Sequence, residues 1–337
     1  MMGDWTSVLN ECPIDWLLEK EDPSVRYFTL VDILGKPADG REVIAAKKSI
    51  MQNGLVPTIL EKQDEGGYWG KPEDFYIRSK YKGTVWTLIL LAGLGADGAD
   101  RRIQKACEFI MEHSQNPTGG FSYKTDKAGS GYLNGVIPCL TGNMVWSLIR
   151  LGYLDDARVQ NGIDFITKYQ RFDDGEKEPP AGWPYDLFEQ KCYGRHTCHM
   201  GVVKALKALA AIPENKRSDA IKNTIANGAE HMLKHHIHKR SHDLSRVSKP
   251  GWLRLGYPLM YHTNILEILE ILTDLGYKDK RMQEAVDVLL SKQDEHGRWK
   301  QDDMLHGRYI VGMETNGKPG KWVTLHALKV LKSYYGQ

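Results

Sequence analysis

The hydrophobic positions along the chain recur with the period of an α-helix, and each strongly apolar run ends at a glycine. Residues 85–95 and 144–152 are two such runs, built mainly from leucine, isoleucine, valine and tryptophan. Each run is followed by an acidic turn and a second, amphipathic run, as in residues 100–113 and 155–169. Glycine after a helix and aspartate before the next are favoured capping residues. The pattern therefore predicts a series of helical hairpins.

A short signature ends several of the second helices and indicates that the hairpins are repeats. It consists of glutamine, three residues, glycine, one residue and an aromatic ring, and it begins at Gln63, Gln115 and Gln293. Looser copies end at Trp183 and Trp252. Because single hairpins cannot bury their apolar faces alone, such repeats must stack against one another.

Six apolar first helices and five more polar partners can be placed along the chain. The first helices are expected near residues 24–34, 84–95, 141–152, 197–211, 261–275 and 321–335. The partners are expected near residues 39–62, 100–115, 155–170, 217–237 and 279–292. The last helix lacks a partner, so we expect the N-terminal segment to pack beside it and close a ring. We predict an all-α fold, a single six-fold α/α toroid over residues 1–337, with an open helical solenoid as the competing architecture.

Composition and charge exclude several classes of protein. Hydrophobic residues make up 41% and charged residues 26% of the chain, which is typical of a globular protein with a large core. A formal net charge of +2 without a sustained lysine or arginine run argues against a nucleic-acid partner. The sequence shows neither a secretory signal pattern nor an uninterrupted apolar stretch of about 18 residues. We therefore expect a cytoplasmic protein without an integral membrane segment.

The signature and the alternation of helices, from Trp16 to Tyr335, resemble the repeats of the terpenoid cyclase and protein prenyltransferase superfamily. Members of that superfamily are six-fold α/α toroids whose central cavity holds isoprenoid chains. The resemblance implies an enzyme that acts on an isoprenoid or another apolar small molecule in such a cavity. The alternative is a non-catalytic toroid that binds an apolar ligand or a partner protein, in which any metal is structural.

The catalytic motifs of the known branches are incomplete in this chain. Class II cyclases carry Asp-x-Asp-Asp, whereas the pair Asp173 and Asp174 lacks the first aspartate. The prenyltransferase zinc site does not transfer, since Gln190 and Val323 stand where that family has aspartate and histidine. Lanthionine synthetase-like cyclases, another toroid group, have Cys-Tyr-Gly and Cys-His-Gly motifs that the segment 192–201 resembles.

Cysteine and histidine gather at the expected starts of two neighbouring first helices. In a toroid these helices run parallel, so their N-termini converge at one end, where free N–H groups and helix dipoles lower thiol pKa values. The candidate ligands are Cys139, Cys192, Cys198 and His199, with His196 as a spare. Three thiolates and one imidazole suit tetrahedral zinc, structural with four protein ligands or catalytic with three. The alternative is that the cysteines are buried small hydrophobes and the histidines polar groups at a helix start.

A second histidine-rich run, residues 235–242, falls at the expected C-terminus of a second helix. Histidine, lysine and arginine at that place satisfy the last carbonyls and the helix dipole. We therefore interpret this run as a helix end rather than as a metal site.

The same end of the ring is expected to supply the walls of the cavity. The candidate lining residues are Tyr76, Arg78, Tyr81, Trp86, Asn143, Trp146, Arg195, Tyr261, His262, Lys321 and Trp322. Their rings would hold an isoprenoid chain or stabilise a carbocation, and their cations would neutralise a diphosphate. The alternative for the tryptophans is that they are packing residues of the repeat.

Overall fold

The computed structural model describes residues 4–194, 197–302 and 309–336, whose regular secondary structure is helical apart from one small hairpin. The predicted first helices correspond to α2 (Pro23–Phe28) with η2 (Thr29–Ile33), α5 (Thr84–Gly93), α7 (Pro138–Arg150), α10 (His199–Ala210), α12 (Ile265–Asp274) and α14 (Lys321–Tyr335). Their partners are α3 (Arg41–Gln52) with α4 (Leu55–Leu60), α6 (Arg101–His113), α8 (Ala157–Tyr169), α11 (Asp219–Lys234) and η7 (Lys280–Met282) with α13 (Gln283–Ser291). The prediction of a mostly helical chain is confirmed.

Shorter elements occupy the N-terminal segment and the connections. They are η1 (Asp4–Val8), α1 (Ile14–Leu17), η3 (Leu133–Gly135), η4 (Tyr185–Leu187), α9 (Gln190–Tyr193), η5 (Glu214–Lys216) and η6 (Pro250–Leu253). Strands β1 (Lys239–Arg240) and β2 (Asp243–Val247) pair antiparallel directly after α11.

Capping residues set the helix boundaries as the sequence predicts. Asp100, Asp156 and Asp279 each accept a hydrogen bond from the backbone N–H two residues later, at the start of a second helix or its first turn. Gly95 and Gly152 follow first helices with φ of 73° and 94°, a left-handed conformation that favours glycine. The predicted second helix 39–62 is broken into α3 and α4 at Gly54, whose φ is 79°.

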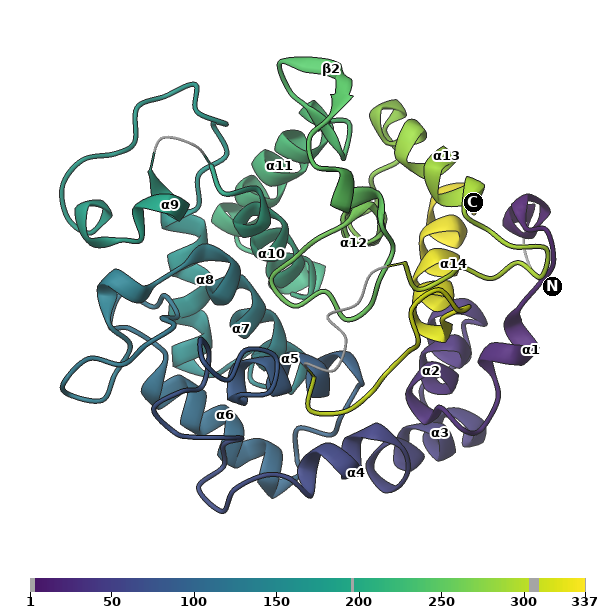
Figure 1. The fold of residues 1–337 in the computed structure, drawn as a ribbon, viewed down its shortest axis with the longest axis horizontal. Coiled ribbons are helices and arrows are strands. Elements are labelled where there is room, and N and C mark those ends of the chain that lie inside the picture. The colour runs from purple at the N-terminus through teal and green to yellow at the C-terminus, as the bar shows by residue number, and fades with distance from the viewer. Residues whose placement is uncertain (1–3, 195–196, 303–308, 337) are drawn as a thin grey trace.

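The first helices form an inner layer and their partners an outer one, as Figure 1 shows. Along the inner layer α5 contacts α7, α7 contacts α10, α10 contacts α12 and α12 contacts α14. The inner helices also contact the outer helix that follows each of them, for example α7 with α8 and α10 with α11. The C-terminal helix α14 contacts α2, η2 and η1, which are contacts that a closed ring requires.

The repeated signature joins the end of one outer helix to the next hairpin. The backbone N–H groups of Trp69, Phe121 and Trp299 donate to a threonine hydroxyl in the first turn of the next inner helix, at 3.1, 2.9 and 3.0 Å. The side-chain amides of Gln63 and Gln115 donate to a carbonyl at the start of the next outer helix, at 2.8 and 2.7 Å. The signature therefore spaces neighbouring hairpins by hydrogen bonds as well as by packing.

Two inner helices approach each other closely at Gly142 of α7. A Cβ atom at this position would lie 2.4 Å from the backbone carbonyl carbon of Lys204 in α10. Only glycine allows the two backbones to pack at this distance.

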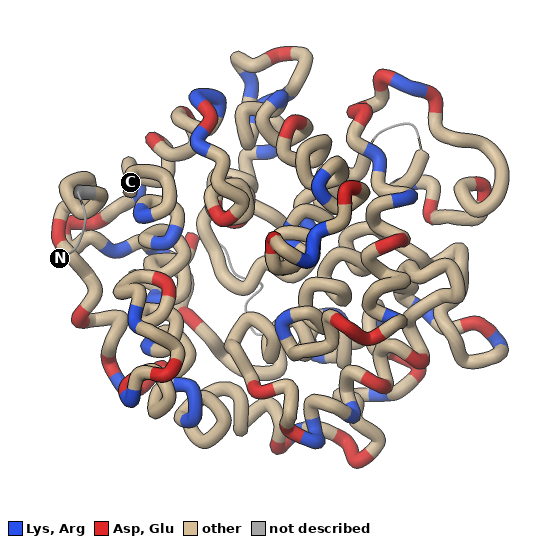
Figure 2. The backbone as a smooth tube through the Cα atoms, turned by 180° about the vertical axis from the view of Figure 1, so that it is seen from behind, with Lys and Arg blue, Asp and Glu red and all other residues tan. Residues whose placement is uncertain are grey.

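Acidic and basic residues are interspersed along the backbone on all sides of the ring of helices, as Figure 2 shows. This distribution agrees with the small net charge and gives no extended field of one sign. Within residues 4–194, 197–302 and 309–336, no helix combines the length and the apolar composition needed to span a bilayer.

Candidate functional site

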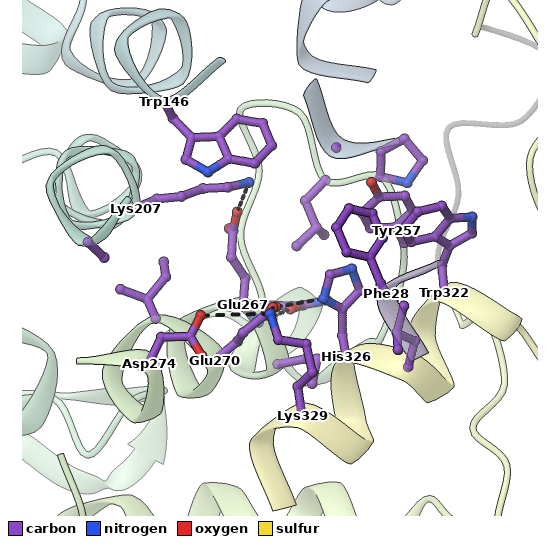
Figure 3. A pocket seen from close by; sticks show the side chains of 18 of the residues that line it. Phe28, Trp146, Lys207, Tyr257, Glu267, Glu270, Asp274, Trp322, His326 and Lys329 are labelled. Carbon is purple, nitrogen blue, oxygen red and sulfur yellow. Dashed lines mark hydrogen bonds and ion pairs between the residues drawn. The ribbon is translucent and has the colours of Figure 1, made fainter. Parts of the chain in front are cut away.

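A cavity of about 490 Å³ lies among the inner helices and is lined by residues of all six of them. On α5, α7 and α10 these lining residues belong to the C-terminal half of the helix, including Gly93, Arg150 and Lys207. The loop segment 256–260, which precedes α12, lines the cavity as well. Figure 3 shows that one wall carries charged side chains and another carries aromatic rings.

The charged wall is built on α12, whose sequence places three carboxylates on one face. Glu267, Glu270 and Asp274 are spaced three and four residues apart, so they project from the same side of the helix and line the cavity. The remaining positions of α12 are almost all apolar and buried, which fixes this orientation.

Glu270 is the centre of a network with residues of α14. Its Oε1 accepts a hydrogen bond of 2.7 Å from Nζ of Lys329, and its Oε2 lies 2.7 Å from Nδ1 of His326. Nζ of Lys329 is also 3.8 Å from Oδ2 of Asp274 and 3.6 Å from Oδ2 of Asp32. One ammonium group therefore serves three carboxylates at this end of the cavity.

Two carboxyl groups of the network have pKa values shifted in opposite directions. Burial opposes ionisation of Glu270, but the charges of His326 and Lys329 outweigh it and hold its pKa below the usual range. Burial raises the pKa of Asp274 to about 6. The positive charge of Lys329 opposes this shift, and the negative charge of Glu270 adds to it. Near neutral pH, Glu270 is thus ionised while Asp274 exchanges a proton readily. The burial of Asp274 is only partial, since 45% of its side chain remains exposed, so solvent can replace that proton.

Glu267 is held by two lysines from α10. Nζ of Lys204 donates to both carboxylate oxygens at 2.7 Å, and Nζ of Lys207 donates to Oε1 at 3.1 Å. Lys204 is fully buried, and this burial lowers its pKa to about 8 in spite of Glu267. Lys207 lines the cavity, and its ammonium lies 4.0 Å from the ring centroid of Trp146.

The aromatic wall is formed by Trp146, Phe28, Tyr257 and Trp322. Tyr257 stacks on Trp322 with 4.6 Å between ring centroids and an angle of 11° between the planes. Its hydroxyl is accommodated by Gly93, where a Cβ atom would lie 2.4 Å from the oxygen. The cavity therefore offers flat apolar faces beside charged hydrogen-bonding groups, since Trp146 lies against Lys207 and Tyr257 lies near His326 (Figure 3).

The predicted lining residues fall into three groups. Trp146 and Trp322 line the cavity. Arg195 lies outside the described residues, as does the spare ligand His196. The remaining candidates lie at or near the starts of the inner helices and do not line this cavity: Tyr76, Arg78, Tyr81, Trp86, Asn143, Tyr261, His262 and Lys321.

The rings at the helix starts pack on one another. Tyr76 stacks on Trp86 at 4.5 Å, while Tyr81 and Tyr261 approach the same indole at 5.3 and 6.1 Å. The side chains of Trp86 and Tyr81 are each only 1% exposed. At this end of the inner helices these rings are packed in the core, in the way that the packing alternative describes.

The predicted zinc ligands lie near one another without forming a compact four-ligand group. The thiols of Cys192 and Cys198 are joined by a hydrogen bond, and this bond is the largest cause that lowers the pKa of Cys198 to about 6. Burial is the main cause that raises the pKa of Cys139 to about 12, and Cys198 adds to it. Among the described residues, the ligand atoms that gather within 4.8 Å belong to His199, His231 and His235.

The carboxylate row and its lysines were missed by sequence reasoning. The signal was present: residues 265–274 read Ile-Leu-Glu-Ile-Leu-Glu-Ile-Leu-Thr-Asp, with acids at one-turn spacing inside an apolar helix. A lysine within the apolar run of α10, at Lys204, is a second signal of the same kind. Charged residues at buried helix positions require partners, and here the partners are each other.

Comparison with known proteins yields structural similarity only. No family model and no curated protein sequence matches the chain. The solved structures it resembles include a protein from Actinoplanes, with 16% identity, a TM-score of 0.45 and coverage of 94% of this chain and 90% of that one. A variant of the type II terpene cyclase MstE from Scytonema gives 15% identity, a TM-score of 0.42 and coverage of 93% and 87%. An unsaturated glucuronyl hydrolase specific for heparin gives 12% identity, a TM-score of 0.47 and coverage of 94% and 85%.

Proposed function

We propose that this chain is an enzyme that performs general acid–base catalysis on a small molecule bound in the central cavity. The observation that carries the proposal is the pair of carboxyl groups on α12, Asp274 as the proton donor and Glu270 as its ionised partner, facing an aromatic wall. The frame that we propose for it is a closed six-fold α/α toroid, which is supported by the contacts of α14 with α2, η2 and η1.

The charged wall favours a hydroxylated ring, such as a sugar, as the substrate. A pure hydrocarbon would displace the water that Glu270, Lys329 and Lys207 contact and would offer no hydrogen bonds in its place. Each group left without a hydrogen bond would cost about 1–3 kcal/mol of binding free energy. A sugar ring supplies hydroxyls to these groups, and its apolar face can stack on Trp146 or Tyr257. We therefore infer a carbohydrate-like substrate.

The corresponding reaction is hydrolysis of a glycosidic bond. Asp274 donates its proton to the leaving oxygen as the bond from that oxygen to the sugar carbon breaks. Glu270, which stays ionised, stabilises the positive charge that develops on the ring. The Asp274 carboxylate left by the first step accepts a proton from the water that attacks the same carbon. Lys329 and His326 keep Glu270 ionised and oriented for this role.

An isoprenoid substrate is the second candidate, and the aromatic wall of Trp146, Tyr257 and Trp322 is the observation that favours it. It ranks lower because protonation of an alkene requires a strong acid. Burial raises the pKa of Asp274 to about 6, which makes it a weaker acid than an ordinary aspartate. A non-catalytic toroid that binds an apolar ligand is the third outcome that an experiment has to separate.

A panel of p-nitrophenyl glycosides would test the proposal with the purified full chain. We expect release of p-nitrophenol from at least one glycoside, and a loss of about 100-fold or more in Asp274→Asn and Glu270→Gln. The matched control is Asp155→Asn, because Asp155 is 82% exposed and pairs with Lys216 on the surface, away from the cavity. Circular dichroism would establish that each variant is folded.

Two results would contradict the proposal. The first is turnover that is unchanged in folded Asp274→Asn. The second is a chain that hydrolyses no glycoside and whose melting temperature no sugar raises, but whose tryptophan fluorescence is quenched by geranylgeranyl diphosphate. This result would support the isoprenoid candidate instead.

A further inference from the structure

Three histidines from two helices meet away from the central cavity. His199 is the first residue of α10, whereas His231 and His235 belong to the last turn and the C-terminal end of α11. The two helices contact each other as an antiparallel hairpin, so the start of one lies beside the end of the other (Figure 1). One ring nitrogen from each histidine lies within 4.8 Å of the others.

The second ring nitrogen of two of these histidines is already fixed by the backbone. Nδ1 of His231 lies 3.2 Å from the carbonyl oxygen of Phe172, and Nδ1 of His235 lies 2.9 Å from that of Lys239. Since a carbonyl oxygen only accepts, each Nδ1 must carry the hydrogen. In a neutral imidazole the Nε2 atom is then a bare acceptor, as in histidines whose outer N–H is held for metal binding.

The three Nε2 atoms are buried and lack a hydrogen-bond donor. For His199, His231 and His235 alike, Nε2 has no hydrogen-bond partner within the part of the chain that the structure describes. The residues His231 and His235 are only 4% and 7% exposed. Buried acceptor atoms without a donor, in rings whose nitrogens gather this closely, are the arrangement that a bound cation would satisfy.

A carboxylate stands beside the three rings. Oδ2 of Asp174 lies 3.4 Å from Nε2 of His235 and accepts a hydrogen bond from the Ser241 hydroxyl. Ligand atoms about 2.0–2.2 Å from a tetrahedral zinc are separated by roughly 3.3–3.6 Å, so the distance between Asp174 and His235 already suits neighbouring ligands. The ring nitrogens of the three imidazoles, which lie within 4.8 Å of one another, would have to close to the same spacing when the ion binds.

We propose that His199, His231 and His235 bind a zinc ion, with Asp174 as the fourth ligand. Imidazole nitrogen and carboxylate oxygen are both common zinc ligands, and the four groups complete a tetrahedral set. The ion joins the start of α10, the end of α11 and the loop around Asp174, three segments that the hydrophobic core holds only in part. With four protein ligands the site has a structural role.

The site is distinct from the central cavity and from the cysteine set of the sequence prediction. His199 and Lys207 are eight residues apart on α10, which places the histidines about 12 Å along the helix from the cavity. Cys198 precedes His199 but its thiol is hydrogen-bonded to that of Cys192. The histidine set and the cysteine set both include His199, so the two sites cannot be occupied at the same time. The zinc proposal does not depend on the proposed catalytic function.

Metal titration of the untagged full chain, after removal of bound metal with a chelator, tests the site. We expect one equivalent of Zn²⁺ to bind and to raise the melting temperature. His231→Gln should weaken binding by at least about 100-fold, the upper end of the loss seen when only an outer-shell partner is removed. The controls are His242→Gln, at an exposed position of the same histidine-rich run, and Cys198→Ser. Both should retain the wild-type affinity.

Co²⁺ in the wild-type chain provides a readout that does not depend on the folding of any variant. Ligation by imidazole and carboxylate gives visible d–d bands without a thiolate-to-cobalt charge-transfer band. A charge-transfer band, or loss of zinc in Cys198→Ser with retention in His231→Gln, would overturn the proposal in favour of the cysteine set. A folded wild-type chain that binds no zinc would overturn both.

Discussion

Replacement of Lys204 by methionine removes one partner of the buried ion pair that joins α10 to α12. The ammonium of Lys204 is fully buried and contacts both oxygens of Glu267, which is itself only 6% exposed. Methionine fills a similar volume, so the main effect of Lys204→Met is a buried carboxylate with one cation fewer.

The size of the effect follows from the remaining partner. Loss of one member of a buried pair typically costs about 3–5 kcal/mol, because the other charge stays desolvated. Here Lys207 remains at 3.1 Å from Glu267 and offsets part of the loss. We expect Lys204→Met to lower the free energy of unfolding by about 2–3 kcal/mol at pH 7. Lys204→Met combined with Glu267→Leu should return to within about 1 kcal/mol of wild type.

The difference between wild type and Lys204→Met should also change with pH. Burial lowers the pKa of Lys204 from 10.5 to about 8, so between these values the unfolded chain binds more protons than the folded one. The contribution of Lys204 to wild-type stability therefore rises as the pH increases from about 8 to 10.5, and the variant lacks this rise. Urea unfolding followed by circular dichroism at several pH values measures both effects.

Two results would refute this reasoning. A loss of less than about 1 kcal/mol in the single variant would mean that the pair is hydrated rather than buried. A double variant as unstable as the sum of the two single variants would mean that Lys204 and Glu267 act independently.

Two further predictions concern the cavity and the contact of α7 with α10. Because the pKa of Asp274 is raised from 3.8 to about 6, its contribution to stability is present below about pH 4 and is lost as the pH rises through 6. Asp274→Asn should therefore remove this pH dependence from the free energy of unfolding. A pH dependence that is the same in wild type and variant would contradict the raised pKa. Gly142→Ala should destabilise the fold by about 2–3 kcal/mol, since its Cβ would lie 2.4 Å from the Lys204 backbone. Gly251→Ala, whose Cβ meets no atom within 4 Å, should cost little, and equal melting temperatures of the two variants would refute the close approach.

The helices could be predicted because their positions depend on local chemistry. Apolar periodicity together with Asp100, Asp156 and similar caps determines where a hairpin begins and ends, and neither requires knowledge of the partner helix. The break between α3 and α4 was missed because one glycine, Gly54, adopts a left-handed conformation within an otherwise helical pattern. Local rules of this kind do not determine at which end of the inner helices a cavity remains open.

The candidate sites were harder to predict because they combine distant segments. The cavity was expected at the helix starts, but Tyr76, Trp86 and Tyr261 pack together there. The histidine-rich run was interpreted as a helix end, and His235 does lie at one. Its pairing with His231 at a spacing of four residues, and with His199 in the preceding helix, becomes visible only when the hairpin is assembled.

The contacts between the two ends of the chain have a consequence for synthesis on the ribosome. The backbone N–H of Asn10 donates to the side chain of Gln293, the ring of His296 lies 2.8 Å from Glu11, and α14 packs on α2 and η2. The surfaces of the first 35 residues therefore stay without their partners until about 300 further residues have been synthesised. A nascent chain halted before α14 must expose a long apolar stripe, which is the kind of surface that chaperones shield.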